Sequence, residues 1–175
     1  MAYTYSKIAT VTVGSGGSSS INFLAIPQNY TDLVLKLSLK SNNTSGGENV
    51  WIRFNGDSGA NYAVRRLYGS GTGTASDTGG TTTYINAAEI NDSLAASANA
   101  FGNAELYIPN YTLSTFKSVS ADAVMEANQT TIYMGINAGV WNSTAAITSI
   151  AMTVQVGTLF VINSTATLYG IKAEV

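Results

Sequence analysis

The side chains that most often carry out catalysis are scarce in this sequence. It has no histidine and no cysteine, so it lacks the usual general base near neutral pH and any thiol nucleophile. The remaining routes are a serine activated by lysine, or paired carboxylates about 5–10 Å apart, as in glycosidases. The ten acidic residues are scattered along the chain, mostly in expected turns or at outward strand positions. We therefore predict that the protein is not an enzyme and uses no cofactor.

Calcium is the one metal for which the sequence offers ligands. Asn55 and Asp57 present oxygen atoms at alternate positions of a segment rich in glycine and asparagine. Calcium is usually bound by roughly six to eight oxygens, several of them from carboxylates. This segment holds a single carboxylate, that of Asp57. We therefore expect a tight turn in which Asp57 bonds the local backbone, and no bound metal.

Aromatic and arginine side chains are better candidates for a binding surface, because both are enriched at protein interfaces. Strand alternation sends Trp51 and Arg53 away from the expected core, and Arg66 and Tyr68 share a face of a later strand. We predict that Trp51, Arg53, Arg66 and Tyr68 contact a partner. The plainer interpretation of Arg53, Arg65 and Arg66 is that they are solvated or salt-bridged strand residues.

Exposed aromatic rings also suggest a second kind of partner, a glycan. Trp51, Tyr68, Tyr107 and Trp141 are the rings that we expect at the surface and that could stack on sugars. The alternative for each ring is packing on a neighbouring strand or at a subunit contact.

The charge content is low and excludes several classes of partner. Charged residues make up 10% of the 175 residues, against about 25% in an average globular domain. A net charge of −2 provides no basic surface for nucleic acid or for an anionic membrane. The chain has no long apolar run and its first residues do not resemble a signal peptide, so we expect synthesis and folding in a cytoplasm. A β-protein with few charges has little protection against association, which suggests that much of its surface is covered in an assembly.

Period-2 alternation of apolar residues predicts an all-β fold. It is clearest in Asp32–Lys40, where Leu33, Leu35, Leu37 and Leu39 share one face. Other expected strands are 7–13, 20–24, 49–54, 62–69, 81–85, 103–108, 116–126, 150–156 and 165–172, and one that Ile132, Met134, Ile136 and Ala138 line.

The intervening segments favour loops, and no linker divides the chain. Ser70–Gly80 is expected to be a flexible loop, and Ala87–Ala100 a loop with at most a short helix. We predict one domain over residues 1–175, a single antiparallel β-sandwich. A jelly roll is the most common arrangement for so many strands in two sheets.

Five segments resemble a group of small virion proteins of tailed bacteriophages: YTDLVLKLSLKS, WIRFNGDSGANY, FGNAELYIPNY, AGVWNSTAAITSI and STATLYGIK. They occur in the same order and span residues from about Tyr30 to Lys172. Members of the group are described as tail, head-fibre or capsid-decoration proteins. The resemblance implies a compact β-sandwich that forms homotrimers on phage particles, and it brings no catalytic residues.

Two functions fit these features. The first is a capsid decoration, or cement, protein that binds the major capsid protein or another virion protein. A single domain without a shaft and with a neutral polar surface favours this function. The second is a tail or fibre module that recognises a glycan of the host surface. Either function places the protein in the virion, after synthesis in the cytoplasm of the bacterial host.

Overall fold

The computed structural model describes residues 3–44, 47–71, 73–90, 99–126 and 133–173. Within these ranges the chain forms strands and no helix, so no helix there could cross a membrane. The strands are β1 (Tyr3–Thr12), β2 (Ile21–Phe23), β3 (Asp32–Leu39), β4 (Glu48–Phe54), β5 (Tyr62–Gly69), β6 (Thr74–Thr82), β7 (Ile85–Ile90), β8 (Gly102–Ile108), β9 (Lys117–Met125), β10 (Tyr133–Trp141), β11 (Ile150–Val154) and β12 (Thr165–Ala173).

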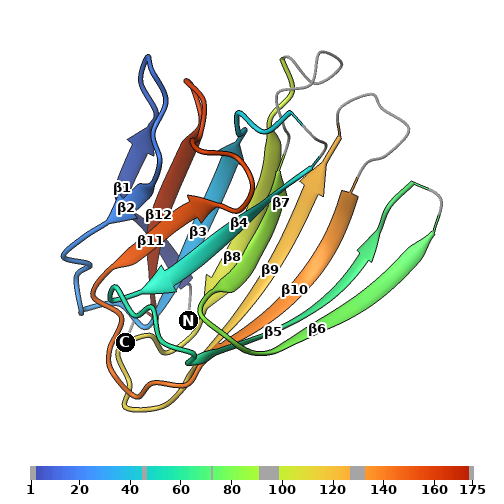
Figure 1. Cartoon of the computed structure of the whole chain (residues 1–175). Helices are drawn as coiled ribbons and strands as arrows, with labels where there is room; N and C mark the ends of the chain where they lie inside the picture. Colours follow the sequence, from blue (N-terminus) through green and yellow to red (C-terminus); the bar gives the residue numbers. More distant parts are fainter. Residues whose placement is uncertain (1–2, 45–46, 72, 91–98, 127–132, 174–175) are drawn as a thin grey trace.

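The strands form two antiparallel sheets of unequal size. The larger sheet has eight strands in the order β1-β12-β3-β8-β9-β10-β5-β6, and the smaller has four in the order β2-β11-β4-β7. Figure 1 shows the smaller sheet lying over part of the larger one, with β5 and β6 extending beyond it. The all-β class and the two antiparallel sheets predicted from the sequence are confirmed.

The core lies between the two sheets and follows the predicted alternation. In β3, Leu33, Leu35, Leu37 and Leu39 are all buried, as expected. Alternate residues of β4, β8 and β9 point into the same layer, which gives these strands their regular pattern of buried and partly or fully exposed positions. Burial of one face fixes the register of β4, β8 and β9, because a shift by one residue would expose that whole face.

Two segments expected to be loops are strands. Ser70–Gly80 contains most of β6, which pairs with β5 at the edge of the larger sheet although nearly all of its residues are exposed. Residues 87–90, expected in a loop or short helix, belong to β7, which pairs with β4. Residues 91–98 of that expected loop lie outside the described residues. The expected short strand 81–85 does not form, because Thr81 and Thr82 are the last residues of β6 and Ile85 is the first residue of β7.

The apolar residues of β10 lie on its outer face. Met134 and Ile136 belong to the apolar set that marks this strand in the sequence, but they are 63% and 64% exposed, whereas Asn137 and Trp141 are buried. The reason is the space available, because the Cγ2 atom of Ile85 lies only 2.7 Å from where a Cβ atom of Gly139 would stand. The face that carries Gly139 therefore points into the core. Ala138, which belongs to the same predicted set as Met134 and Ile136, is also exposed, and Ile132 is not among the described residues.

Candidate ligand-binding groove

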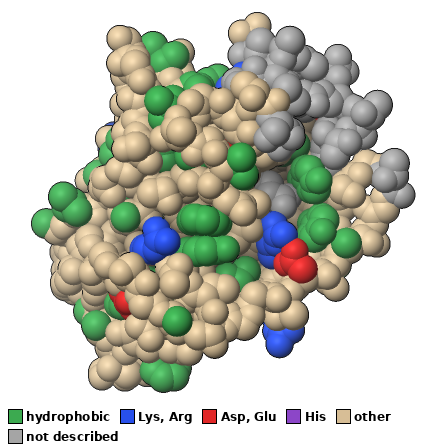
Figure 2. All heavy atoms as spheres, viewed as in Figure 1, with side chains coloured by type: hydrophobic (Ala, Val, Ile, Leu, Met, Phe, Trp, Pro, Cys, Tyr) green, Lys and Arg blue, Asp and Glu red, His purple; other side chains and the backbone are tan. Residues whose placement is uncertain are grey.

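A groove runs along the step where the smaller sheet ends and the inner face of β5 and β6 begins. It consists of two adjoining hollows of about 290 Å³ and about 330 Å³, which share Asn49, Arg66 and Gln155 as lining residues. Figure 2 views this face and shows hydrophobic side chains in its centre beside a group of opposite charges. Volumes near 300 Å³ are typical of small-molecule sites, which also combine aromatic walls with a few polar groups.

Aromatic rings line both hollows. In the first, Trp51 of β4 stacks on Tyr84, with ring centroids 4.1 Å apart and an interplanar angle of 15°. In the second, Tyr68 of β5 and Tyr133 of β10 lie with centroids 6.0 Å apart. The groove therefore has apolar surfaces on which a flat ligand ring can lie.

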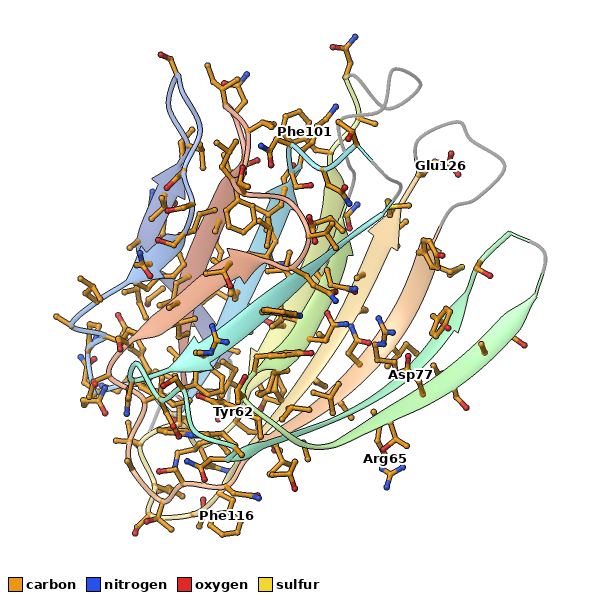
Figure 3. The ribbon with its side chains drawn as sticks, viewed as in Figure 1. Tyr62, Arg65, Asp77, Phe101, Phe116 and Glu126 are labelled. Atoms are coloured by element: carbon orange, nitrogen blue, oxygen red, sulfur yellow. The ribbon has the colours of Figure 1, made fainter. Side chains whose placement is uncertain are left out.

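Arg66 stands between the two hollows and is held from several sides. Its Nε atom donates to Oδ1 of Asp77 at 2.9 Å, and its Nη1 atom donates to Oδ1 of Asn49 at 3.1 Å. The guanidinium carbon also lies 5.2 Å from the ring centroid of Tyr68. Hydrogen bonding to Arg66 lowers the pKa of Asp77, so the pair is charged but has no net charge near neutral pH. Figure 3 shows Asp77 on the groove side of β5 and β6.

Amide side chains complete the polar lining. The Nδ2 atom of Asn49 donates to Oε1 of Gln155 at 2.6 Å, and Nδ2 of Asn86 donates to Oδ1 of Asn49 at 3.0 Å. The other end of the Asn86 amide is different. Its Oδ1 atom is buried, and it has no hydrogen-bond partner in the part of the chain that the structure describes. A buried acceptor without a partner costs about 1–3 kcal/mol, so Asn86 is the residue in the groove that would gain most from a donating ligand.

An irregularity in β7 places Asn86 in the groove. The pairing of β4 with β7 shifts between Val50 and Trp51, so that Val50 faces Ala88 while Trp51 faces Asn86. The bulge leaves Ala87 unpaired and lets both alanines stay buried. Bulges are common next to functional sites because they redirect a side chain, and this one sets Asn86 beside Trp51.

A buried carboxylate shapes the rim of the groove. Glu48 is 1% exposed, and its Oε1 atom accepts hydrogen bonds from the backbone N–H groups of Asn49, Gln155 and Val156 at 2.9–3.0 Å. Its Oε2 atom accepts a further one from Gly157 at 2.6 Å. The carboxylate thus fixes the chain that follows β11, from which Gln155 projects into both hollows.

The structure brings together three of the four residues predicted to contact a partner. Trp51, Arg66 and Tyr68 all line the groove, and Trp51 is partly buried there. Arg53 does not line it. Its Nε atom donates to the carbonyl oxygen of Thr83 at 2.8 Å, which holds the segment that carries Tyr84.

Two other rings proposed as sugar platforms lie elsewhere. Trp141 is 2% exposed and packs between Phe54 and Tyr62, so the expectation that it is exposed is wrong. Tyr107 is 38% exposed on the larger sheet, and its hydroxyl donates to Oδ2 of Asp32 at 2.9 Å. Neither ring reaches the groove.

The turn considered for calcium uses its oxygen atoms within the protein. Oδ1 of Asn55 accepts from the backbone N–H groups of Thr148 and Ser149, and Asp57 accepts from Gly59 and Asn61. Among the described residues no cluster of acidic side chains could hold a metal ion.

Several groove residues were missed from the sequence. Tyr84 lies in a short connection between strands, and Asn86, Asn49 and Gln155 are amides in a chain that is rich in them. No spacing rule singles them out, because the groove joins segments from β4, β5, β6 and β7 with the end of β11. The asparagine between Ile85 and the alanine pair Ala87-Ala88 was the one available signal.

Comparisons with known proteins found no relative of this chain. No protein-family model, no curated protein and no solved structure matches the chain.

Proposed function

We propose that this chain is a non-enzymatic surface protein of a tailed-bacteriophage virion, and that its groove binds a glycan of the host surface. The virion assignment is supported by the five segments that resemble phage virion proteins, and a jelly-roll form of the sandwich accords with it. The binding function is supported by the groove.

The buried, unpaired Oδ1 atom of Asn86 beside the Trp51–Tyr84 stack is the observation that carries this proposal. Sugars present apolar C–H faces, which pack on aromatic rings, and hydroxyl groups, which both donate and accept hydrogen bonds. Gln155 and Arg66 line the groove and offer polar contacts to sugar hydroxyls, and a ligand hydroxyl would satisfy the buried Oδ1 atom of Asn86 once that side chain turns toward the groove. Since Arg66 is already neutralised by Asp77, the groove favours neutral sugars over phosphorylated or sialylated ones.

The test uses an array of bacterial surface polysaccharides, followed by titration of the glycans that bind. Trp51 lines the groove and Trp141 is buried, and the chain has no other tryptophan, so a change in tryptophan emission reports on the groove of the wild type, and isothermal titration calorimetry measures the affinities of the variants. Trp51→Ala should reduce affinity at least about tenfold, corresponding to about 1.4 kcal/mol. Tyr5→Ala is the matched control, because Tyr5 is an exposed ring on β1 at the far edge of the larger sheet.

Asn86→Ala gives a sharper test, because stability and binding should respond differently. Removing the unpaired oxygen relieves a cost in the free protein, and Oδ1 of Asn49 keeps its bond from Arg66. The melting temperature should therefore change little, while glycan affinity falls. If no glycan binds the wild type, or if Asn86→Ala binds as well as the wild type, the proposal is wrong.

Capsid decoration is the second candidate, and a different surface favours it. Phe116 and Leu113 are 61% and 52% exposed in the connection before β9. Figure 3 shows Phe116 at one end of the sandwich, away from the groove side of β5. Exposed large apolar side chains mark protein-binding surfaces when they gather. Under this function Phe116→Ser with Leu113→Ser should abolish attachment to particles and leave glycan binding unchanged.

A further inference from the structure

The face of the larger sheet opposite the groove carries an apolar patch that the core does not use. The outer patch consists of Leu67, Val124, Met134 and Ile136, which are 58%, 39%, 63% and 64% exposed. Strand pairing makes these residues neighbours, since Ile136 lies opposite Leu67, and Met134 opposite Val124. The patch forms because the apolar residues of β10, Met134 and Ile136, lie on the outer face of the strand.

The charges beside the patch are of opposite sign and lie on opposite sides of β10. Arg65 precedes Leu67 by two residues on β5, and Asp122 precedes Val124 by two residues on β9. Both are exposed and share the outer face with the patch, and Figure 3 shows Arg65 pointing away from the groove. Lys36 and Glu105, further along this face, form an ion pair with each other at 2.6 Å, and the exposed Glu126 follows Val124 by two residues.

This arrangement is complementary to itself. A two-fold axis that lies in the plane of the contact, over the patch, would place the apolar side chains of two copies against one another. The same axis would set Arg65 of one copy against Asp122 of the other, twice in each pair. Among the described residues neither Arg65 nor Asp122 has an ion-pair partner within its own chain.

We propose that the outer patch binds a second copy of this chain, through apolar contact between the patches and reciprocal Arg65–Asp122 ion pairs. Such a contact closes after two subunits and covers exposed apolar surface on a protein with few charges. It is two-fold, so it differs from the trimer that the sequence resemblance implies. It leaves the groove open, because the groove lies on the other face of β5.

Charge reversal tests the pairing directly. Arg65→Asp alone would set two carboxylates against each other across the contact, and Asp122→Arg alone would set two guanidinium groups together. Each single variant should weaken self-association at least about tenfold, while the double variant Arg65→Asp/Asp122→Arg should restore it. Sedimentation equilibrium of the full chain at micromolar to submillimolar concentrations measures these constants. Ile136→Asn, which changes an exposed side chain, should give a folded monomer with an unchanged circular dichroism spectrum.

Any one of the following results would overturn the proposal: a wild-type monomer at about 100 µM, a trimer as the wild-type species, or a dimer that the single reversals leave intact. Failure of the double variant to recover association would also exclude the Arg65–Asp122 pairing. Glycan titration of the same variants keeps this question separate from the function of the groove, since none of these residues lines either of its hollows.

Discussion

The indole Nε1 atom of Trp141 donates a 2.7 Å hydrogen bond to Oδ2 of Asp57. This bond joins the end of β10 to the turn after β4, so it links the larger sheet to the smaller one. The same carboxylate accepts from Asn61 and from the backbone of Gly59. These bonds, with that of Trp141 first, lower the pKa of Asp57 below its ordinary value.

Asp57 should therefore make stability depend on pH in the acid range. Its folded pKa is depressed, so its contribution is fully present above the unfolded value of about 3.9 and is lost as the pH falls through the folded pKa. Asp57→Asn should cost about 1–3 kcal/mol at pH 7. The difference between wild type and variant should shrink below about pH 4. Urea unfolding at a series of pH values measures both, and a constant difference down to about pH 2 would contradict the assignment.

Replacement of Glu48 by glutamine should destabilise the rim of the groove. The amide would bring an N–H₂ donor to a site where backbone N–H groups surround both carboxylate oxygens. We expect a loss of about 1–3 kcal/mol in the free energy of unfolding, with weaker glycan binding because Gln155 shifts. Glu105→Gln is the control, since Glu105 forms an exposed ion pair with Lys36 that is worth at most about 1 kcal/mol. Equal effects of the two changes would argue against the role of Glu48.

Gly170 is a position where β12 cannot accept a side chain. A Cβ atom there would overlap the ring of Tyr30, which covers the strand. Gly170→Ala should cost about 1–3 kcal/mol through displacement of that ring. Gly80→Ala in β6 is the matched control, because an added Cβ there meets no atom within 4 Å and its backbone is not in the left-handed region. Thermal melts of both variants compare them, and a fully stable Gly170→Ala protein would show that Tyr30 moves freely.

Leu35 tests the core itself. It is fully buried on β3, opposite Leu106 of β8 and Leu168 of β12. Leu35→Asp would bury a carboxylate without a partner and should unfold the domain, whose whole stability is on the order of 5–15 kcal/mol. Leu35→Ala should cost about 2–5 kcal/mol and remain folded. An unchanged melting temperature for either variant would show that the register of β3 is wrong.

The sequence predicts a strand well where one face is buried and the other is not. The leucines Leu33, Leu35 and Leu37 alternate with mostly polar neighbours because the core lies on one side of β3, although Val34 and Asp32 on the other side are also buried. Strand β6 carries no such pattern, since it is an edge strand with both faces exposed and is held by backbone pairing to β5. The apolar residues of β10 lie on its outer face, which the sequence does not reveal. The inner face carries Gly139, against which Ile85 packs closely, and that contact depends on the approach of the two sheets.

The binding site was predictable only in part. Trp51, Arg66 and Tyr68 were identified from residue type and strand alternation, but as separate contacts on an open surface. Their convergence in one groove depends on how far β5 and β6 extend beyond the smaller sheet, which no local pattern encodes. The bulge that brings Asn86 beside Trp51 is likewise a property of strand pairing.

The unequal size of the two sheets has a consequence for local unfolding. Where β6 runs beyond the smaller sheet, nearly all of its residues are exposed, so backbone pairing with β5 is its main support. Amide hydrogens of β6 should exchange with solvent through openings that leave β3, β8 and β12 closed. A glycan in the groove would touch β4 and β6 together and slow that exchange, so binding would stabilise the least stable part of the larger sheet.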